Sequence, residues 1–104
     1  MGYKLFIDDL RMPPTEDWVI ARSSYEAWEI VQILGAPDII SYDHDLGEED
    51  TSMLFIHRLI RHKLDNPDFN FPVNYTIHSA NPVGVKNIDG LLRSFIRTLD
   101  NDNA

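Results

Sequence analysis

Three short segments of the chain place acidic, imidazole and hydroxyl side chains directly after an apolar run. The segments are Asp8-Asp9, Asp43-His44-Asp45 and His78-Ser79. Carboxylates bind divalent cations, and imidazole, whose pKa lies near neutrality, moves protons in phosphate chemistry. The end of a buried strand has no packing use for such groups, because unpaired buried charges are costly. The segments therefore predict metal or phosphate chemistry at a shared site.

The acidic residues favour a divalent cation that prefers oxygen ligands. Carboxylates gathered at one place raise one another's pKa values unless a cation compensates them. The chain has no cysteine, so thiolate ligands are excluded and Mg²⁺ or Mn²⁺ fits best. We expect Asp8, Asp9 and Asp43 to hold the ion, with a solvated turn as the alternative for the first two. Asp45 is a further ligand, an acid that acts through water, or a residue that shapes the turn.

The neighbouring side chains fit the handling of a phosphate group. His44 and His78 are candidates for a general acid and base, and a hydrogen-bonded structural role is the alternative for each. Arg11 either contacts a phosphate oxygen or pairs with a nearby acid. Ser79 and Asn81, with the first amides of the last helix, form a possible anion-binding cradle, although helix capping alone explains Asn81.

The apolar pattern predicts the elements that carry these residues. Strands are expected at residues 4–7, 18–21, 38–42 and 73–77, and amphipathic helices after Ser23, over residues 51–64, and from Pro82 to about Leu99. Ser23 and Glu26 have capping-box spacing, and Asn81 before Pro82 is typical of a helix start. Strands separated by helices favour a parallel sheet, whose carboxyl ends share one edge. Ligands bind at that edge in open α/β sheets, so the three segments are expected to meet there.

The bulk composition limits the class of protein. The 104 residues suit one domain, which we place at residues 1–99 with a frayed tail at 100–104. A net charge of -8 argues against a broad surface for nucleic acid or anionic membranes. No apolar stretch is long enough for a signal peptide or a membrane span, and the lack of cysteine favours a cytoplasmic location. The expected partner is a small phosphate-containing ligand, and no protein partner is indicated.

The order of the functional residues resembles a receiver domain. An acidic pair follows the first strand, one acid follows the third, and a hydroxyl residue with Ala80 behind it follows the fourth. In receiver domains the acids hold Mg²⁺, the third-strand acid accepts a phosphoryl group, and the hydroxyl contacts that group. The resemblance assigns these roles to Asp8, Asp9, Asp43 and Ser79, and it makes Asp43 the central catalytic candidate.

Two features differ from a standard response regulator: a proline loop at residues 11–17 replaces the first helix, and the fifth strand with its lysine is missing. The stretches Phe6–Arg11 with Pro13-Pro14, Ser41–Gly47 and His78–Gly84 look instead like the cyclic-phosphate processing receiver domain family. This resemblance covers nearly the whole chain and implies a role in processing cyclic phosphates.

These observations predict an α/β domain of receiver-like (flavodoxin-like) fold, with a truncated parallel sheet of about four strands flanked by helices. The leading functional hypothesis is a metal-dependent phosphoesterase, a hydrolase acting on a cyclic nucleotide or a 2′,3′-cyclic phosphate end. The alternative is a non-catalytic module that senses a phosphate ligand or accepts a phosphoryl group. A scaffold that has lost its chemistry is the third possibility.

Overall fold

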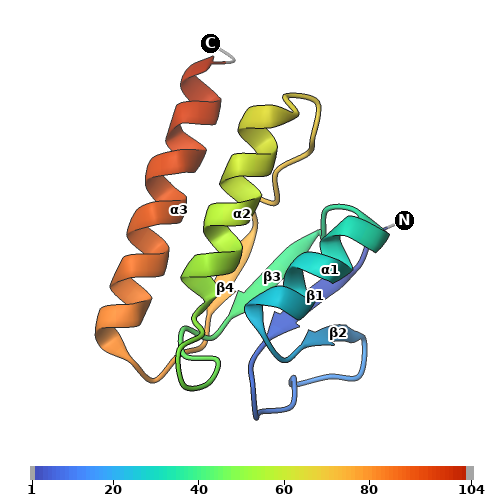
Figure 1. The fold of residues 1–104 in the computed structure, drawn as a ribbon, viewed down its shortest axis with the longest axis vertical. Helices are drawn as coiled ribbons and strands as arrows, with labels where there is room; N and C mark the ends of the chain where they lie inside the picture. Colours follow the sequence, from blue (N-terminus) through green and yellow to red (C-terminus); the bar gives the residue numbers. More distant parts are fainter. Residues whose placement is uncertain (1, 103–104) are drawn as a thin grey trace.

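The computed structural model, which describes residues 2–102, contains four strands and three helices in the predicted order (Figure 1). The elements are β1 (Lys4–Ile7), β2 (Trp18–Ala21), α1 (Ser24–Leu34), β3 (Ile39–Tyr42), α2 (Ser52–Asp65), β4 (Tyr75–Ile77) and α3 (Pro82–Asp102). The strands pair in parallel in the order β2-β1-β3-β4. This arrangement confirms the predicted receiver-like α/β fold, a four-stranded parallel sheet flanked by helices.

The strand register aligns the carboxyl ends of the three consecutive strands β1, β3 and β4. Ile7 pairs with Tyr42 across β1 and β3, and Tyr42 pairs with Ile77 across β3 and β4. The strand order also reverses at β1, because β2 is added on one side of it and β3 on the other. A point of this kind in an open α/β sheet creates a crevice for ligands at the carboxyl ends of the strands.

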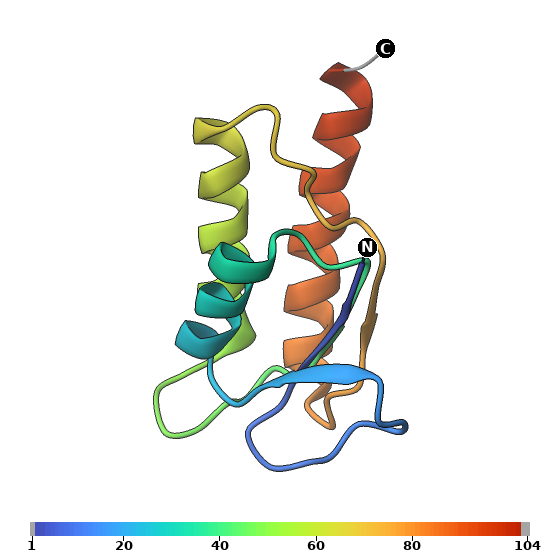
Figure 2. The same cartoon turned by 90° about the vertical axis from the view of Figure 1, so that its right-hand side faces the viewer.

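The helices bury one side of the sheet. Alternate side chains of a strand point to opposite faces, and Leu5, Ile7, Ile40 and Tyr42 are at most 1% exposed and pack in one cluster with the buried residues of α1, α2 and α3. Figure 2 shows the helices together on one side of the strands. This shared apolar cluster packs one face of the sheet against the helices. The remaining side chains of each strand point to the opposite face.

The opposite face carries a smaller cluster of aromatic and polar side chains. Phe6 is 4% exposed and contacts Trp18, with ring centroids 6.0 Å apart and edge-to-face geometry. Ser41 of β3 lies on the same face and is 6% exposed. The side chains on this face lead to the carboxyl ends of β1 and β3.

Both predicted helix caps are confirmed. The Ser23 hydroxyl accepts a hydrogen bond from the backbone N–H of Glu26 at 3.0 Å, and α1 begins at the next residue, Ser24. The Asn81 side-chain oxygen accepts from the backbone N–H groups of Val83 and Gly84, each at 3.1 Å. Such caps satisfy amides that the first helical turn leaves without partners.

The element boundaries differ slightly from those expected. β4 begins at Tyr75 rather than residue 73, and residues 73–74 are irregular chain, while β3 begins at Ile39 rather than residue 38. α3 continues through Asp102, three residues beyond the predicted end, and the last two residues of the predicted tail lie outside the described residues. Within residues 2–102, the helices lack the combination of length and apolar character needed to cross a membrane.

Two glycines of α3 provide a matched test of its packing. A Cβ atom on Gly84 would lie 2.4 Å from His44 Cγ, whereas one on Gly90 would meet nothing within 4 Å. We expect Gly84→Ala to destabilise the protein by about 1–3 kcal/mol through overpacking. Gly90→Ala should stabilise it by about 0.5–1 kcal/mol, because alanine favours the helix interior. Urea unfolding followed by circular dichroism measures both, and equal effects of the two substitutions would contradict the packing of α3 on His44.

Candidate functional site at the carboxyl edge of the sheet

The parallel hydrogen-bond ladder continues one residue past the ends of three strands. In each case the first residue after the strand donates its backbone N–H to the neighbouring strand. The three bonds are Asp8 N to Ala21 O at 3.1 Å, Asp43 N to Ile7 O at 2.9 Å, and His78 N to Tyr42 O at 2.9 Å. The sheet itself therefore places Asp8, Asp43 and His78 side by side.

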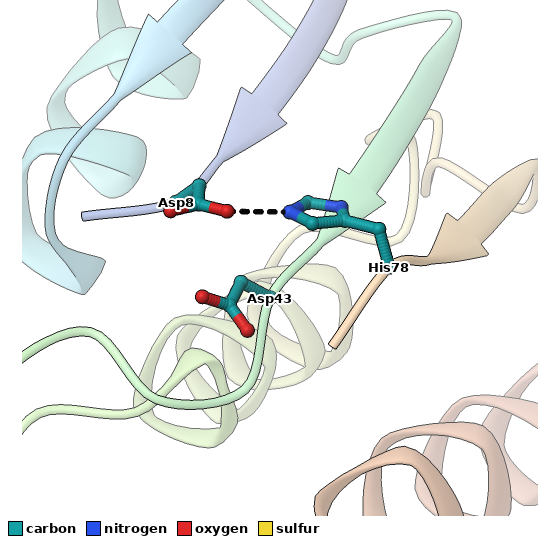
Figure 3. Close-up of side chains that lie close together, drawn as sticks. All are labelled: Asp8, Asp43 and His78. Atoms are coloured by element: carbon teal, nitrogen blue, oxygen red, sulfur yellow. Dashed lines mark hydrogen bonds and ion pairs between the residues drawn. The ribbon is translucent and has the colours of Figure 1, made fainter. Parts of the chain in front are cut away.

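The alternation of strand side chains directs these three residues to one face. Counting along each strand, Asp8 has the orientation of Phe6, and Asp43 that of Ser41, on the side away from the helices. One ligand atom from each of Asp8, Asp43 and His78 lies within 4.8 Å of the others (Figure 3). Within residues 2–102 this is the one group of three acidic, histidine or cysteine side chains with such spacing. Two carboxylates and one imidazole form a donor set that fits a divalent cation.

Asp8 is held as a buried carboxylate. Its side chain is 1% exposed, and Oδ1 accepts hydrogen bonds from the backbone N–H groups of Leu10 at 2.9 Å and Arg11 at 2.8 Å. Oδ2 lies 2.9 Å from His78 Nε2. Burial alone would raise the pKa of Asp8, but the bonds from Arg11, Leu10 and His78 outweigh it and hold the pKa below its ordinary value. Asp8 is therefore ionised near neutral pH.

For Asp43, the effects that raise the pKa outweigh those that lower it. Burial, followed by the negative charge of Asp8, raises the pKa of Asp43. A hydrogen bond from the backbone N–H of His44 at 2.9 Å and the effect of the nearby Ser79 side chain only partly offset these effects. Paired carboxyl groups whose pKa values diverge in this way are common in functional sites, and a bound cation would relieve their repulsion.

His78 is constrained on three sides. Its Nε2 faces Asp8, and its Nδ1 lies 2.7 Å from the hydroxyl of Ser41. The ring also stacks on Phe6, with centroids 4.5 Å apart and planes inclined by 5°. Sequence reasoning assigned no role to Ser41 or Phe6, although both share the alternating face that leads to the site.

Three predicted residues lie outside the Asp8–Asp43–His78 group. Asp9 is half-buried next to the group, and none of its atoms belongs to it. Asp45 is exposed, and its carboxylate accepts a hydrogen bond from Asn81 Nδ2 at 3.1 Å and pairs with His44 Nδ1 at 3.1 Å. His44 contacts α3 at Gly84, on the helix side of the sheet. The alternation of side chains thus separates His44 from Asp43.

The predicted phosphate ligands border the group. Ser79 accepts a hydrogen bond from the backbone N–H of Asn81 at 3.1 Å and also interacts with the Asp43 carboxyl group. Arg11 Nη1 donates to the backbone oxygen of His78 at 3.0 Å, which places its guanidinium beside the site. Asn81 is already engaged in capping α3 and in binding Asp45, as its hydrogen bonds show.

Arg22 is a site residue that sequence reasoning missed. Its Nη1 donates to the backbone oxygens of Asp8 at 3.0 Å and Arg11 at 2.6 Å, which ties the loop after β1 to the residue after β2. The available signal was its position directly after the second predicted strand, at the same edge as the other candidates. Arg22 therefore supports the loop that shapes Asp8.

A surface hollow of about 730 Å³ lies away from this edge, between α1 and α2. Its lining includes Tyr25, Trp28, Leu54 and Arg58, and it contains none of the three clustered residues. The functional candidate is thus the carboxyl edge of the sheet rather than this hollow, because the edge gathers the ionisable groups with shifted pKa values.

The strand order and the acidic strand ends together define a receiver-like α/β domain. A comparison with protein families gives the particular family: the cyclic-phosphate processing receiver domain matches residues 3–94, and the chain belongs to this family. Comparison with curated proteins gave no match, nor did comparison with solved structures. The matched region contains Asp8, Asp43 and His78, and the family name indicates a role in cyclic-phosphate processing.

Neutralising the two carboxyl groups should have opposite effects on stability. Asp8→Asn removes a charged acceptor from three hydrogen bonds and should cost about 1–3 kcal/mol. Asp43→Asn removes a half-buried charge next to Asp8 and should raise the melting temperature. Thermal unfolding near pH 7 in EDTA measures both effects. A lowered melting temperature for both variants would contradict the repulsion between these carboxylates.

The two effects should also differ in their pH dependence. The lowered pKa of Asp8 stabilises the fold above the ordinary aspartate pKa, and this contribution is lost as the pH falls toward the lowered value. The raised pKa of Asp43 makes its ionised form unfavourable, so the penalty disappears as the pH falls through the raised value. The gain from Asp43→Asn should vanish by about pH 4, whereas the cost of Asp8→Asn should begin to decrease only below that pH. The free energies of unfolding of the wild type and both variants, measured by urea denaturation at a series of pH values, test these two pH dependences.

Proposed function

We propose that this protein is a divalent-metal-dependent phosphoesterase that hydrolyses cyclic phosphates at the carboxyl edge of its sheet. The observation that carries the proposal is the Asp8–Asp43–His78 group, whose ligand atoms lie within 4.8 Å of one another. The family name supports cyclic phosphates as the substrate class. The open edge of the sheet suits a phosphate that is presented either on a small molecule or on a chain end.

Four residues at this edge have defined tasks in this proposal. Asp8 and Asp43 hold the cation, which when bound neutralises phosphate charge and polarises a phosphorus–oxygen bond. Arg11, which lies beside His78, and the Ser79 hydroxyl orient the phosphate. The Asp43 carboxyl oxygen that is not on the cation receives a proton from the attacking water.

The reaction adds one water to the cyclic ester. The water oxygen forms a bond to phosphorus as its proton passes to Asp43, and one ring phosphorus–oxygen bond breaks. The leaving oxygen takes a proton from solvent at the open edge, and Asp43 later returns its proton to solvent. We assign no proton transfer to His44, because its ring contacts α3 on the helix side.

An assay with 2′,3′-cyclic AMP and Mn²⁺ tests the proposal. We expect hydrolysis to a nucleoside monophosphate, loss of activity in EDTA, and a decrease of about 10²–10³-fold or more for Asp43→Asn. Glu49→Gln, which changes an exposed acid in the loop after β3, is the matched control and should retain activity. Hydrolysis that survives both EDTA and Asp43→Asn would rule out this mechanism.

The alternative is a phosphoacceptor module that does not turn over. It is favoured by one observation, the position of the Ser79 side chain near the Asp43 carboxyl group, which matches the residue types of a receiver site. Acetyl phosphate with Mg²⁺ followed by intact mass measurement separates the two functions. A stable phosphoryl adduct that is absent from Asp43→Asn supports the alternative, and an unmodified chain that hydrolyses the cyclic substrate supports the phosphoesterase.

A further inference from the structure

We propose that His78 Nε2 is the third protein ligand of the cation and that the Ser41 hydroxyl is a positioning residue that orients this imidazole. As a consequence, the site prefers Mn²⁺ to Mg²⁺. This inference rests on the metal-binding part of the proposed function. It assigns Ser41 a role in the site and changes the expected role of His78 from proton carrier to ligand.

Ser41 is the first observation. It is 6% exposed within a strand whose other residues are Ile39, Ile40 and Tyr42. Burying a hydroxyl group without a partner is unfavourable, so a serine at this position requires a specific contact. That contact is with His78 Nδ1 at 2.7 Å.

The orientation of the His78 ring is the second observation. Phe6 stacks on one face of the ring at 4.5 Å between centroids, and the ring nitrogens contact Ser41 and Asp8 at opposite sides. These contacts leave the imidazole little freedom to rotate. Nε2 is therefore held toward Asp8, and the Asp43 carboxyl group lies beside this pair (Figure 3).

The hydrogen-bonding capacity of serine explains why a hydroxyl group is suitable here. Without a cation, the Asp8 carboxylate can only accept, so Nε2 carries a proton, and in the neutral ring Nδ1 accepts from Ser41. A cation requires the lone pair of Nε2, so the proton must instead reside on Nδ1, where the Ser41 oxygen accepts it. The Nε2 proton leaves to solvent and Nδ1 takes one from solvent, so the neutral ring keeps one proton. A hydroxyl group serves both states, whereas a methyl group serves neither.

The donor set then determines the metal preference. Mg²⁺ binds best to oxygen ligands and retains several waters, whereas imidazole nitrogen suits transition metals. Mn²⁺ accepts carboxylate oxygens and lies on the transition-metal series, so it combines well with two carboxylates and one imidazole. His78 as a ligand therefore makes Mn²⁺ the better of the two ions expected from the sequence.

Mn²⁺ binding provides the first test. Electron paramagnetic resonance of free Mn²⁺ gives its affinity, and competition with Mg²⁺ gives the preference. We expect Ser41→Ala to weaken Mn²⁺ binding about 10–100-fold, as is typical when the hydrogen-bond partner of a ligating histidine is removed. Ser41→Thr retains the hydroxyl group and should restore most of the affinity. Thr76→Ala, which removes an exposed hydroxyl from the neighbouring strand β4, is the matched control and should bind Mn²⁺ normally.

The tautomer of His78 provides a second test that needs no variant. Long-range ¹H–¹⁵N spectra of the wild-type protein should show the Nε2–H form without metal. Titration with Zn²⁺, a diamagnetic transition-metal probe, should convert it to the Nδ1–H form with a metal-bound Nε2. A His78 ring that does not bind the metal would not show this change, and the measurement stands even if Ser41→Ala does not fold.

The outcomes separate the inference from the proposed function. Mn²⁺ binding that depends on Asp43 but is unaffected by Ser41→Ala, with no tautomer change at His78, overturns the inference and leaves metal-dependent hydrolysis by the carboxylates intact. Absence of any divalent-ion binding overturns both. Tight Mn²⁺ binding with loss on Ser41→Ala supports the inference even when 2′,3′-cyclic AMP is not hydrolysed, because affinity and tautomer are measured without substrate.

Discussion

The site depends on one backbone feature, the continuation of the parallel hydrogen-bond ladder one residue beyond the ends of β1, β3 and β4. Those bonds fix the backbones of Asp8, Asp43 and His78 on neighbouring strands, where side chains of three distant segments meet. The ladder depends in turn on the apolar cluster that packs the strands against the helices. The backbone position of each of these residues is thus determined by sheet geometry, and the loop after β1 adds the amides that hold the Asp8 side chain.

The electrostatics of the group follow from this placement. Asp8 is stabilised as an anion by backbone amides and His78, and Asp43 is destabilised as an anion by burial and by Asp8. A fold selected only for stability would have little reason to keep both acids at adjacent strand ends, because removing one charge relieves the repulsion. The local cost is consistent with a site that is completed by a positively charged ligand.

Much of the architecture was predictable from local pattern. The strands, the helix caps at Ser23 and Asn81, and the order of functional residues all follow from short-range rules, and the family resemblance is confirmed over residues 3–94. It was harder to predict which side chains at each strand end share the site. Asp8 and Asp43 meet, whereas Asp9 lies outside the group, since one residue of shift along a strand changes the face to which a side chain points.

The amino-acid sequence by itself determined which chemical groups this protein has at its strand ends, because apolar runs, caps and turn residues specify the elements locally. Only the tertiary structure decided which of those groups share a site. His44 and His78 are equivalent candidates in the sequence, yet one contacts α3 and the other faces Asp8. Ser41 gained its role in the same way, since its partner is 37 residues away. The physical reason is that strand register and side-chain alternation, which act across the sheet, convert sequence neighbours into residues on opposite faces.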